Sequence, residues 1–159
     1  MPAVLIVCTA NICRSPIAMG ILAHKAAQAF PDQPWTVASA GTWAKPGRKA
    51  HEFSRLVAAK QGLDIESHRS QPVSAELLAE FDLVLTMEQG HKEALRIEFP
   101  QAARRIFVIS EMAGYAYDIP DPIGFPVGEY EATYRELDRL LTSGWDRICQ
   151  LVKAAPPVA

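Results

Sequence analysis

The sequence predicts an α/β domain in which helices cover both faces of a parallel sheet. Short apolar runs alternate with longer segments of helical period, as in strands joined by crossover helices. The chain has 159 residues, of which 49% are hydrophobic and 21% charged, and this fits one domain with a single core. Because no repeat or linker divides residues 1–159, we expect one domain with a frayed tail at 154–159.

The first half of the chain contains two predicted strand–helix pairs. Residues 3–7 are an apolar run that predicts a buried strand, and residues 16–29, rich in Ala, Ile and Leu, predict a helix. Residues 35–40 predict a second strand that ends at a glycine, and residues 48–61 a second helix. The second helix should stop at Gly62, because glycine readily adopts the left-handed C-cap conformation.

The second half continues this alternation. Residues 81–86 predict a third strand, and residues 88–97 a helix that ends before Pro100. Residues 105–109 predict a fourth strand. The proline-rich segment 113–126 is expected to be a loop without a helix.

The last predicted helix has the clearest period. Its apolar side chains are spaced by three or four positions and form one stripe: Tyr130, Tyr134, Leu137, Leu141, Trp145, Ile148 and Val152. We expect one continuous helix with a weak point at Gly144, since glycine inside a helix costs about 1 kcal/mol relative to alanine.

The segment that joins the first strand to the first helix points to a function. Residues 8–15 read Cys-Thr-Ala-Asn-Ile-Cys-Arg-Ser and lie at the carboxyl end of the strand, where ligands bind in such sheets. Successive backbone N–H groups can turn inward there as an anion nest, and the helix directs its positive end at the same point. We therefore expect a phosphate cradle, with six residues of the segment holding the phosphate: Thr9, Ala10, Asn11, Ile12, Cys13 and Ser15.

Two side chains of this cradle should act on the phosphate directly. Helix N-termini and nearby cations favour the thiolate form of cysteine, so Cys8 is expected to be a nucleophile that attacks phosphorus. Arg14 can place its planar fork on two phosphate oxygens. Ser15 is expected to cap the helix, with Pro16 at the first helical position, and to donate a hydrogen bond to the thiolate.

The reaction also needs an acid to protonate the leaving oxygen, and the loop before the last helix offers Asp118 and Asp121. Asp121 is the better candidate, because Pro122 favours an extended conformation of the residue before it. An Asp-Pro pair on its own is ordinary turn chemistry. Together with the cradle, it predicts that Asp121 protonates the leaving group and later accepts a proton from the attacking water.

These segments resemble the low-molecular-weight protein tyrosine phosphatases, and the resemblance covers nearly the whole chain. It includes two further segments, Ser39-Ala40-Gly41-Thr42 and Leu83-Val84-Leu85-Thr86-Met87-Glu88. The resemblance implies a flavodoxin-like fold with a four-stranded parallel sheet. It implies that Cys8 is the nucleophile, Arg14 the phosphate clamp and Asp121 the general acid. No metal or other cofactor is expected, because the cradle itself supplies the positive charge.

The resemblance also implies supporting residues. Asn11, in a left-handed conformation, and Ser15 would hold the cradle. Ser39 and His68 are similar to the residues that form a supporting hydrogen-bond network in the family.

The expected substrate is a phosphotyrosine protein or a small aryl phosphate, and several departures from the family pattern bear on it. Trp43 and Ile123 are the candidate walls for the substrate ring, although family members often carry aromatic residues after the Asp-Pro pair. Ala10 stands where the family more often has glycine, and would be strained if this position required a positive φ. Relatives that act on phosphoarginine tend to carry threonine at the position of Ile12, so isoleucine here resembles the tyrosine-directed members.

Other functions remain as alternatives. The first is an arginine phosphatase of the same fold. An arsenate reductase of this fold would need two further relay cysteines, and the 80s, where they would be expected, contain none. Besides Cys8 the chain has only Cys13, which lies inside the cradle, and Cys149, which falls on the apolar side of the last helix. A zinc module would need a second ligand pair, and the histidines are scattered at positions 24, 51, 68 and 91. A domain that binds phosphotyrosine without hydrolysis would not need a nucleophile, a clamp and an acid together.

Cys13 carries a hypothesis of its own. A reactive thiolate is oxidised to sulfenic acid, which a neighbouring thiol can trap as a disulfide, so Cys8 and Cys13 could form a reversible redox pair. Packing as a small buried residue is the other interpretation of Cys13.

Composition limits the partners and the compartment. The net charge of −2 gives no reason to expect nucleic acid or an anionic membrane as a partner. An odd number of cysteines, three, argues against a secreted disulfide framework, and the N-terminal apolar run is too short for a signal peptide. We expect a cytoplasmic protein, and the sequence carries no signal for its oligomeric state.

Overall fold

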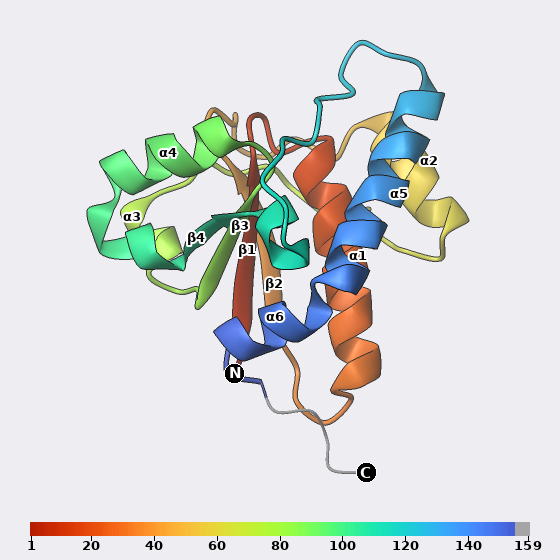
Figure 1. Ribbon diagram of the computed structural model, residues 1–159. Helices are drawn as coiled ribbons and strands as arrows, with labels where there is room; N and C mark the ends of the chain where they lie inside the picture. The colour runs from red at the N-terminus through yellow and green to blue at the C-terminus, as the bar shows by residue number, and fades with distance from the viewer. Residues whose placement is uncertain (155–159) are drawn as a thin grey trace.

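A four-stranded parallel sheet forms the centre of the computed structural model, which describes residues 1–154 (Figure 1). The strands follow the order β2-β1-β3-β4 across the sheet. Their bounds are Ala3–Cys8 for β1, Thr36–Gly41 for β2, Leu83–Thr86 for β3 and Ile106–Val108 for β4. The predicted fold class, a flavodoxin-like α/β domain with a four-stranded parallel sheet, is confirmed.

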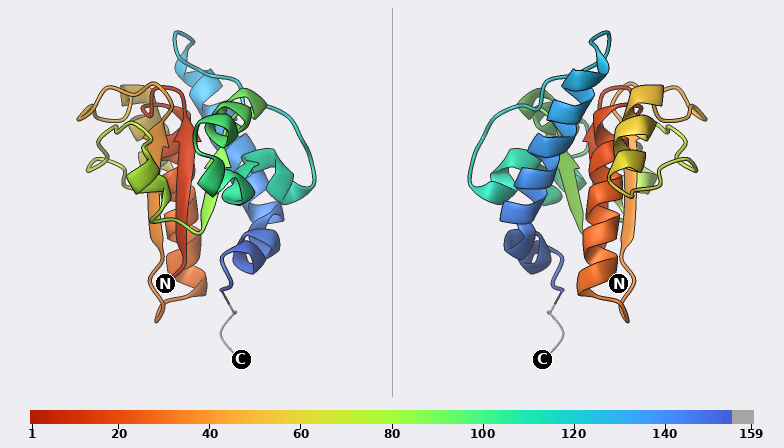
Figure 2. Two further views of the ribbon diagram at one scale, coloured as in Figure 1. Left: turned by 90° about the vertical axis from the view of Figure 1, so that its left-hand side faces the viewer. Right: turned by 90° about the vertical axis from the view of Figure 1, so that its right-hand side faces the viewer.

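Helices cover both faces of this sheet. Helices α1 and α5 lie side by side on one face, together with α2 and α6 (Figures 1 and 2). Helices α3 and α4 lie on the other face. Their bounds are Arg14–Ala29 for α1, Glu52–Lys60 for α2, Ala75–Leu78 for α3, Gln89–Glu98 for α4, Val127–Ser143 for α5 and Trp145–Leu151 for α6. Two 3₁₀ helices complete the fold, η1 at Pro100–Arg105 and η2 at Ile109–Ala113.

Strand β1 is buried on both of its faces. Successive side chains of a strand point in opposite directions, so the residues of β1 pack alternately into the two cores. Val4 and Ile6 pack into the core under α1 and α5, whereas Leu5 and Val7 pack into the core under α3 and α4. This explains why the strand is a continuous apolar run rather than an alternating one.

The break at Gly144 differs from the single continuous helix predicted at the end of the chain. Helix α5 ends at Ser143 and α6 begins at Trp145. A Cβ atom on residue 144 would lie 2.5 Å from the Cβ of Met112, so the glycine allows η2 to pack against the chain at this point. The apolar stripe nevertheless continues across the break, and its members Leu137, Leu141 and Ile148 are fully buried.

Other boundaries differ by a few residues. Helix α1 begins at Arg14, two residues before the predicted start, and α2 begins at Glu52 rather than residue 48. Gly62 has a φ of 75°, as the predicted C-terminal stop requires. In the predicted frayed tail, Ala154 is 7% exposed and its N–H donates to the carbonyl of Cys149, while residues 155–159 lie outside the described residues.

The carboxyl ends of the strands meet at one edge of the sheet, where Cys8 ends β1 and Gly41 ends β2. The N–H of Thr42 donates to the carbonyl of Cys8, and that of Trp43 to the carbonyl of Thr9, both at 2.9 Å. A side chain on Gly41 would collide with the carbonyl of Thr9, so glycine is required for this close approach. Within residues 1–154, no helix is both long and apolar enough to cross a bilayer.

Candidate active site

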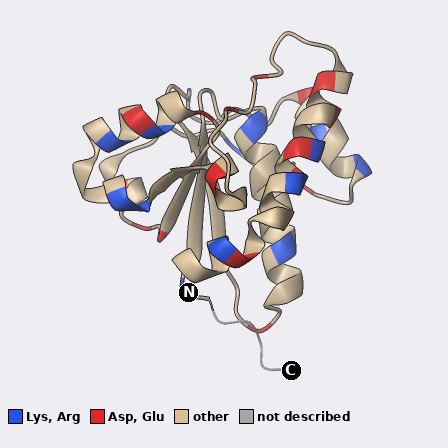
Figure 3. Cartoon of the chain, viewed as in Figure 1, with Lys and Arg blue, Asp and Glu red and all other residues tan. Residues whose placement is uncertain are grey.

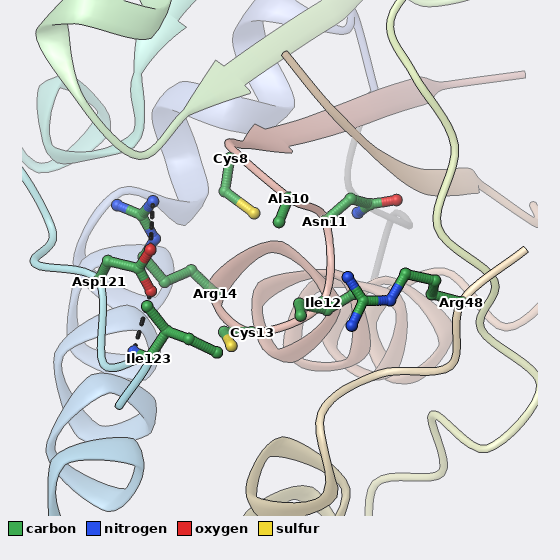
Figure 4. A pocket seen from close by; sticks show the side chains of 9 residues that line it. All are labelled: Cys8, Ala10, Asn11, Ile12, Cys13, Arg14, Arg48, Asp121 and Ile123. Carbon is green, nitrogen blue, oxygen red and sulfur yellow. Dashed lines mark hydrogen bonds and ion pairs between the residues drawn. The ribbon is translucent and has the colours of Figure 1, made fainter. Parts of the chain in front are cut away.

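A cavity of about 260 Å³ opens at this edge of the sheet (Figure 4). The residues that line it come from the predicted cradle, from the loop before α5 and from the loop after β2: Cys8, Ala10, Asn11, Ile12, Cys13, Arg14, Arg48, Asp121 and Ile123. The structure thus brings the candidate nucleophile, clamp and acid to one cavity. Two predicted phosphate-binding side chains, Thr9 and Ser15, do not line it and instead support its walls.

Cys8 lies at the base of the cavity and is 2% exposed. Its Sγ lies 3.0 Å from the Oγ of Ser15. The Ser15 oxygen already accepts a hydrogen bond of 2.7 Å from the side-chain amide of Asn11, so its own hydrogen is available to the sulfur. Ser15 can therefore donate a hydrogen bond to the sulfur of Cys8.

Ser15 does not cap the helix as predicted. Helix α1 begins at Arg14, and its N-cap residue, Cys13, makes no side-chain capping hydrogen bond. The prediction was wrong because the serine hydroxyl is held between Cys8 and Asn11 and cannot reach the backbone of the helix.

Asn11 is the structural centre of the cradle. It is fully buried with a φ of 61°, and the predicted left-handed conformation is observed. Its side-chain amide donates to Ser15 and, at 2.9 Å, to Ser39, and its side-chain oxygen accepts from the backbone N–H of Gln71. Ala10 does not have a positive φ, so the alanine that replaces the family's glycine causes no such strain.

His68 supports Asn11 from behind. Its Nε2 donates to the main-chain carbonyl of Asn11 at 2.8 Å, and its Nδ1 lies 3.5 Å from the hydroxyl of Ser39. Burial lowers the pKa of His68, which favours the neutral ring. The two predicted supporting residues therefore lie where they can fix the orientation of the cradle.

Arg14 is 1% exposed, and its guanidinium is held most closely through one terminal nitrogen. One terminal nitrogen, Nη1, donates to the Oε2 of Glu88 at 2.6 Å and to the carbonyl of Ile119 at 2.8 Å. Its Nε has no hydrogen-bond partner among the described residues. The other terminal nitrogen, Nη2, makes a longer hydrogen bond of 3.4 Å to the hydroxyl of Thr9. Nε and the second hydrogen of Nη2 can therefore bind two oxygens of a phosphate group.

Glu88 and His91 belong to this site, although sequence analysis assigned a role to neither. His91 Nε2 lies 2.9 Å from the hydroxyl of Thr9, and His91 Nδ1 accepts the backbone N–H of Glu88. At the start of α4, Glu88 thereby holds Arg14, and His91 holds Thr9. Glu88 ends a segment shared with the family, and this was the one signal that could have identified it.

Asp121 lines the cavity, whereas Asp118 does not. The Oδ1 of Asp121 accepts the N–H of Ile123, which orients the carboxylate, and its Oδ2 lies 3.7 Å from Nη2 of Arg14. Asp118 instead accepts the N–H of Gln89 at the start of α4. Pro122 follows the acid and is buried, which anchors the loop.

The two candidate walls for a substrate ring are placed differently. Ile123 lines the cavity next to Asp121 (Figure 4). Trp43 does not line it, because the loop after β2 turns its side chain into solvent, where it is 86% exposed. In its place Arg48, a residue that sequence analysis did not consider, lines the opposite side of the cavity.

Cys13 packs against α5, with its Sγ 3.5 Å from the hydroxyl of Tyr130. Burial raises the pKa of Cys13 to about 11, so its thiol stays protonated and reacts slowly with oxidants. Cys8 and Cys13 are both free thiols on the wall of one cavity. Peroxide should therefore oxidise Cys8 first, and Cys13 can then trap the sulfenic acid as a disulfide.

We predict that peroxide inactivates the wild-type protein reversibly and that the Cys13→Ser variant is inactivated irreversibly. Activity before and after dithiothreitol measures the difference, with Cys149→Ser, a buried cysteine of α6, as the matched control. The redox pair is excluded if Cys13→Ser recovers as completely as the wild type.

Within residues 1–154, no group of three or more His, Cys, Asp or Glu side chains could hold a metal ion. Arg14, Arg48 and the N-terminus of α1 bring positive charge to the cavity.

Comparisons with known proteins agree with this geometry. The profile of the family described as low molecular weight phosphotyrosine protein phosphatase matches residues 3–153. A protein-arginine-phosphatase from Geobacillus stearothermophilus is 34% identical over 87% of this chain and 90% of its own length. The low molecular weight protein-tyrosine-phosphatase Wzb from Salmonella typhi is 35% identical over 86% of this chain and 87% of its own length. The crystal structure of a low molecular weight protein tyrosine phosphatase from T. tengcongensis superposes with a TM-score of 0.86 at 37% identity, covering 92% of this chain and 99% of that one.

Proposed function

The chain belongs to the low molecular weight phosphotyrosine protein phosphatase family, and we propose that it removes phosphate from tyrosine side chains of proteins through a phosphocysteine on Cys8. The observation that carries this proposal is the unpartnered Nε of the buried Arg14 guanidinium, in the same cavity as Cys8 and Asp121. A phosphate group placed there is bound by the arginine, attacked by the thiolate and reached by the acid.

In the first step, the Cys8 thiolate attacks phosphorus in line with the phenolic oxygen. The S–P bond forms, the P–O bond breaks, and Asp121 gives its proton to the leaving oxygen. Arg14 and the backbone N–H groups of residues 9–14 stabilise the charge on the equatorial oxygens.

In the second step, water attacks the phosphocysteine while Asp121 accepts a proton from it. The S–P bond breaks, inorganic phosphate is released, and the electron pair returns to Cys8. The Ser15 hydroxyl, 3.0 Å from the sulfur, stabilises the thiolate as a leaving group.

Ile12 supports phosphotyrosine rather than phosphoarginine as the substrate. The relatives include phosphatases of both kinds at nearly equal identity, 34% and 35%, so overall similarity does not decide between them. Ile12 lines the cavity and offers apolar surface to a phenyl ring, but no hydroxyl to a phosphorylated guanidinium.

We predict that wild type prefers a phosphotyrosine peptide and that Ile12→Thr shifts the ratio of kcat/KM values toward a phosphoarginine peptide by about tenfold, the effect of one good hydrogen bond. Ile12→Val is the matched control, because it changes the size of the side chain without adding a hydroxyl. A wild-type preference for phosphoarginine would overturn the substrate assignment but not the chemistry.

We place the reaction in the cytoplasm. The mechanism requires the thiol of Cys8 to remain reduced, and a reducing compartment keeps such thiols free.

A further inference from the structure

The loop that follows β2, residues 42–49, borders the cavity from the side opposite Asp121 (Figure 4). We call it the basic loop, because it contains Lys45, Arg48 and Lys49 and no acidic residue. The chain as a whole has a net charge of −2, and acidic and basic side chains are intermixed on α4 and α5 (Figure 3). The basic loop therefore concentrates positive charge next to the cavity.

The basic loop is held in place by Ser70, which is 2% exposed. The N–H of Arg48 donates to the Oγ of Ser70 at 2.9 Å, and the N–H of Ser70 donates to the carbonyl of Arg48 at 2.7 Å. The Ser70 hydroxyl donates to the carbonyl of Lys45, and the N–H of Gly47 donates to the carbonyl of Ser70. At its start, the loop is joined to the cradle by the hydrogen bond from Trp43 to Thr9. The loop is therefore preorganised, and a ligand need not order it on binding.

The three cations of the basic loop have exposed side chains that make no hydrogen bond or ion pair with the described residues. Other cations nearby are engaged, since Arg55 pairs with Glu66 and Arg69 donates to main-chain carbonyls. Trp43, on the same loop, is 86% exposed. The loop thus combines unpaired positive charge with an exposed aromatic ring, and one of its cations, Arg48, lines the cavity.

We propose that the basic loop binds acidic side chains that flank the phosphorylated tyrosine of the substrate protein. This inference rests on the proposed function. In an extended peptide, side chains two positions apart point to the same side, roughly 7 Å apart, so residues at −2 and +2 accompany the phosphotyrosine toward the enzyme. Among the cations of the basic loop, Arg48 is the one that lines the cavity itself, so it is the best placed to meet such a carboxylate.

The test compares two phosphotyrosine peptides that differ only in having Glu or Gln at both −2 and +2. Wild type should hydrolyse the Glu peptide with a kcat/KM about three- to tenfold higher, the effect of two exposed ion pairs, mainly through KM. The advantage should shrink at high ionic strength, because exposed charges are screened. In a variant carrying Lys45→Gln, Arg48→Gln and Lys49→Gln, the ratio of the two values should fall to about one.

The ratio is measured within one enzyme preparation, so it does not depend on the fraction of folded protein. Arg104→Gln is the matched control, because this exposed arginine of η1 precedes β4 and lies at the opposite edge of the sheet. The inference is overturned if wild type treats both peptides alike or if the triple variant retains the wild-type ratio. Failure of wild type to hydrolyse either peptide would instead overturn the proposed function, and the inference with it.

Discussion

Replacement of Cys8 by serine should reduce phosphatase turnover by about 10⁴- to 10⁶-fold, as loss of a covalent nucleophile does elsewhere, while the cradle still binds phosphate. A serine hydroxyl is not ionised at neutral pH and is a far weaker nucleophile than a thiolate. Arg14 and the backbone N–H groups are unchanged by the substitution. The rate on p-nitrophenyl phosphate with EDTA present measures turnover, and titration calorimetry with inorganic phosphate measures binding.

Cys149→Ser is the control for the loss of a thiol, because Cys149 packs in the core beneath α6 rather than in the cavity. It should retain activity on p-nitrophenyl phosphate. Turnover by Cys8→Ser within tenfold of wild type would show that the nucleophile lies elsewhere, and loss of phosphate binding would show that the cradle had collapsed.

Replacement of Asp121 by alanine should lower kcat on a phosphotyrosine peptide by about 10²- to 10⁴-fold, the usual effect of a lost general acid. The unactivated phenolate of tyrosine leaves slowly without a proton. Nitrophenolate is a much better leaving group, so the first step with p-nitrophenyl phosphate should be far less affected. The difference between the two substrates separates the loss of an acid from general damage to the site.

Asp118→Ala is the matched control for this prediction. Asp118 lies three residues from Asp121 in the same loop, but its carboxylate accepts the N–H of Gln89 outside the cavity. We expect its kcat to stay near that of wild type. An Asp121→Ala enzyme with unchanged kcat on the phosphotyrosine peptide would refute the assignment of the acid.

The cradle could be predicted from the sequence because its parts are contiguous. The strand, the turn and the helix that build it occupy one short segment, and Asn11 is a residue type that tolerates the left-handed conformation this turn needs. The sheet was predictable for a similar reason, since each strand is a local apolar run between helical segments.

The residues that sequence analysis missed are brought in from other segments. Glu88 reaches Arg14 from the end of β3, and Arg48 reaches the cavity from the loop after β2, so neither spacing nor composition reveals the contact. Trp43 was a candidate wall for the substrate ring. The direction of its side chain, however, follows from how Ser70 and Thr9 fix the loop backbone. Gly144 was expected to weaken a helix, and the structure shows that close packing against Met112 requires a glycine there.

The covalent intermediate is the central claim, and the Asp121→Ala enzyme offers the most direct test of it. With p-nitrophenyl phosphate, this variant should complete the first step but lack the base for the second, so the phosphoenzyme should accumulate. Mass spectrometry of the quenched protein should then show one added phosphoryl group, located on the peptide that contains Cys8. An unmodified protein during turnover, or a phosphoryl group on any other residue, would contradict the account.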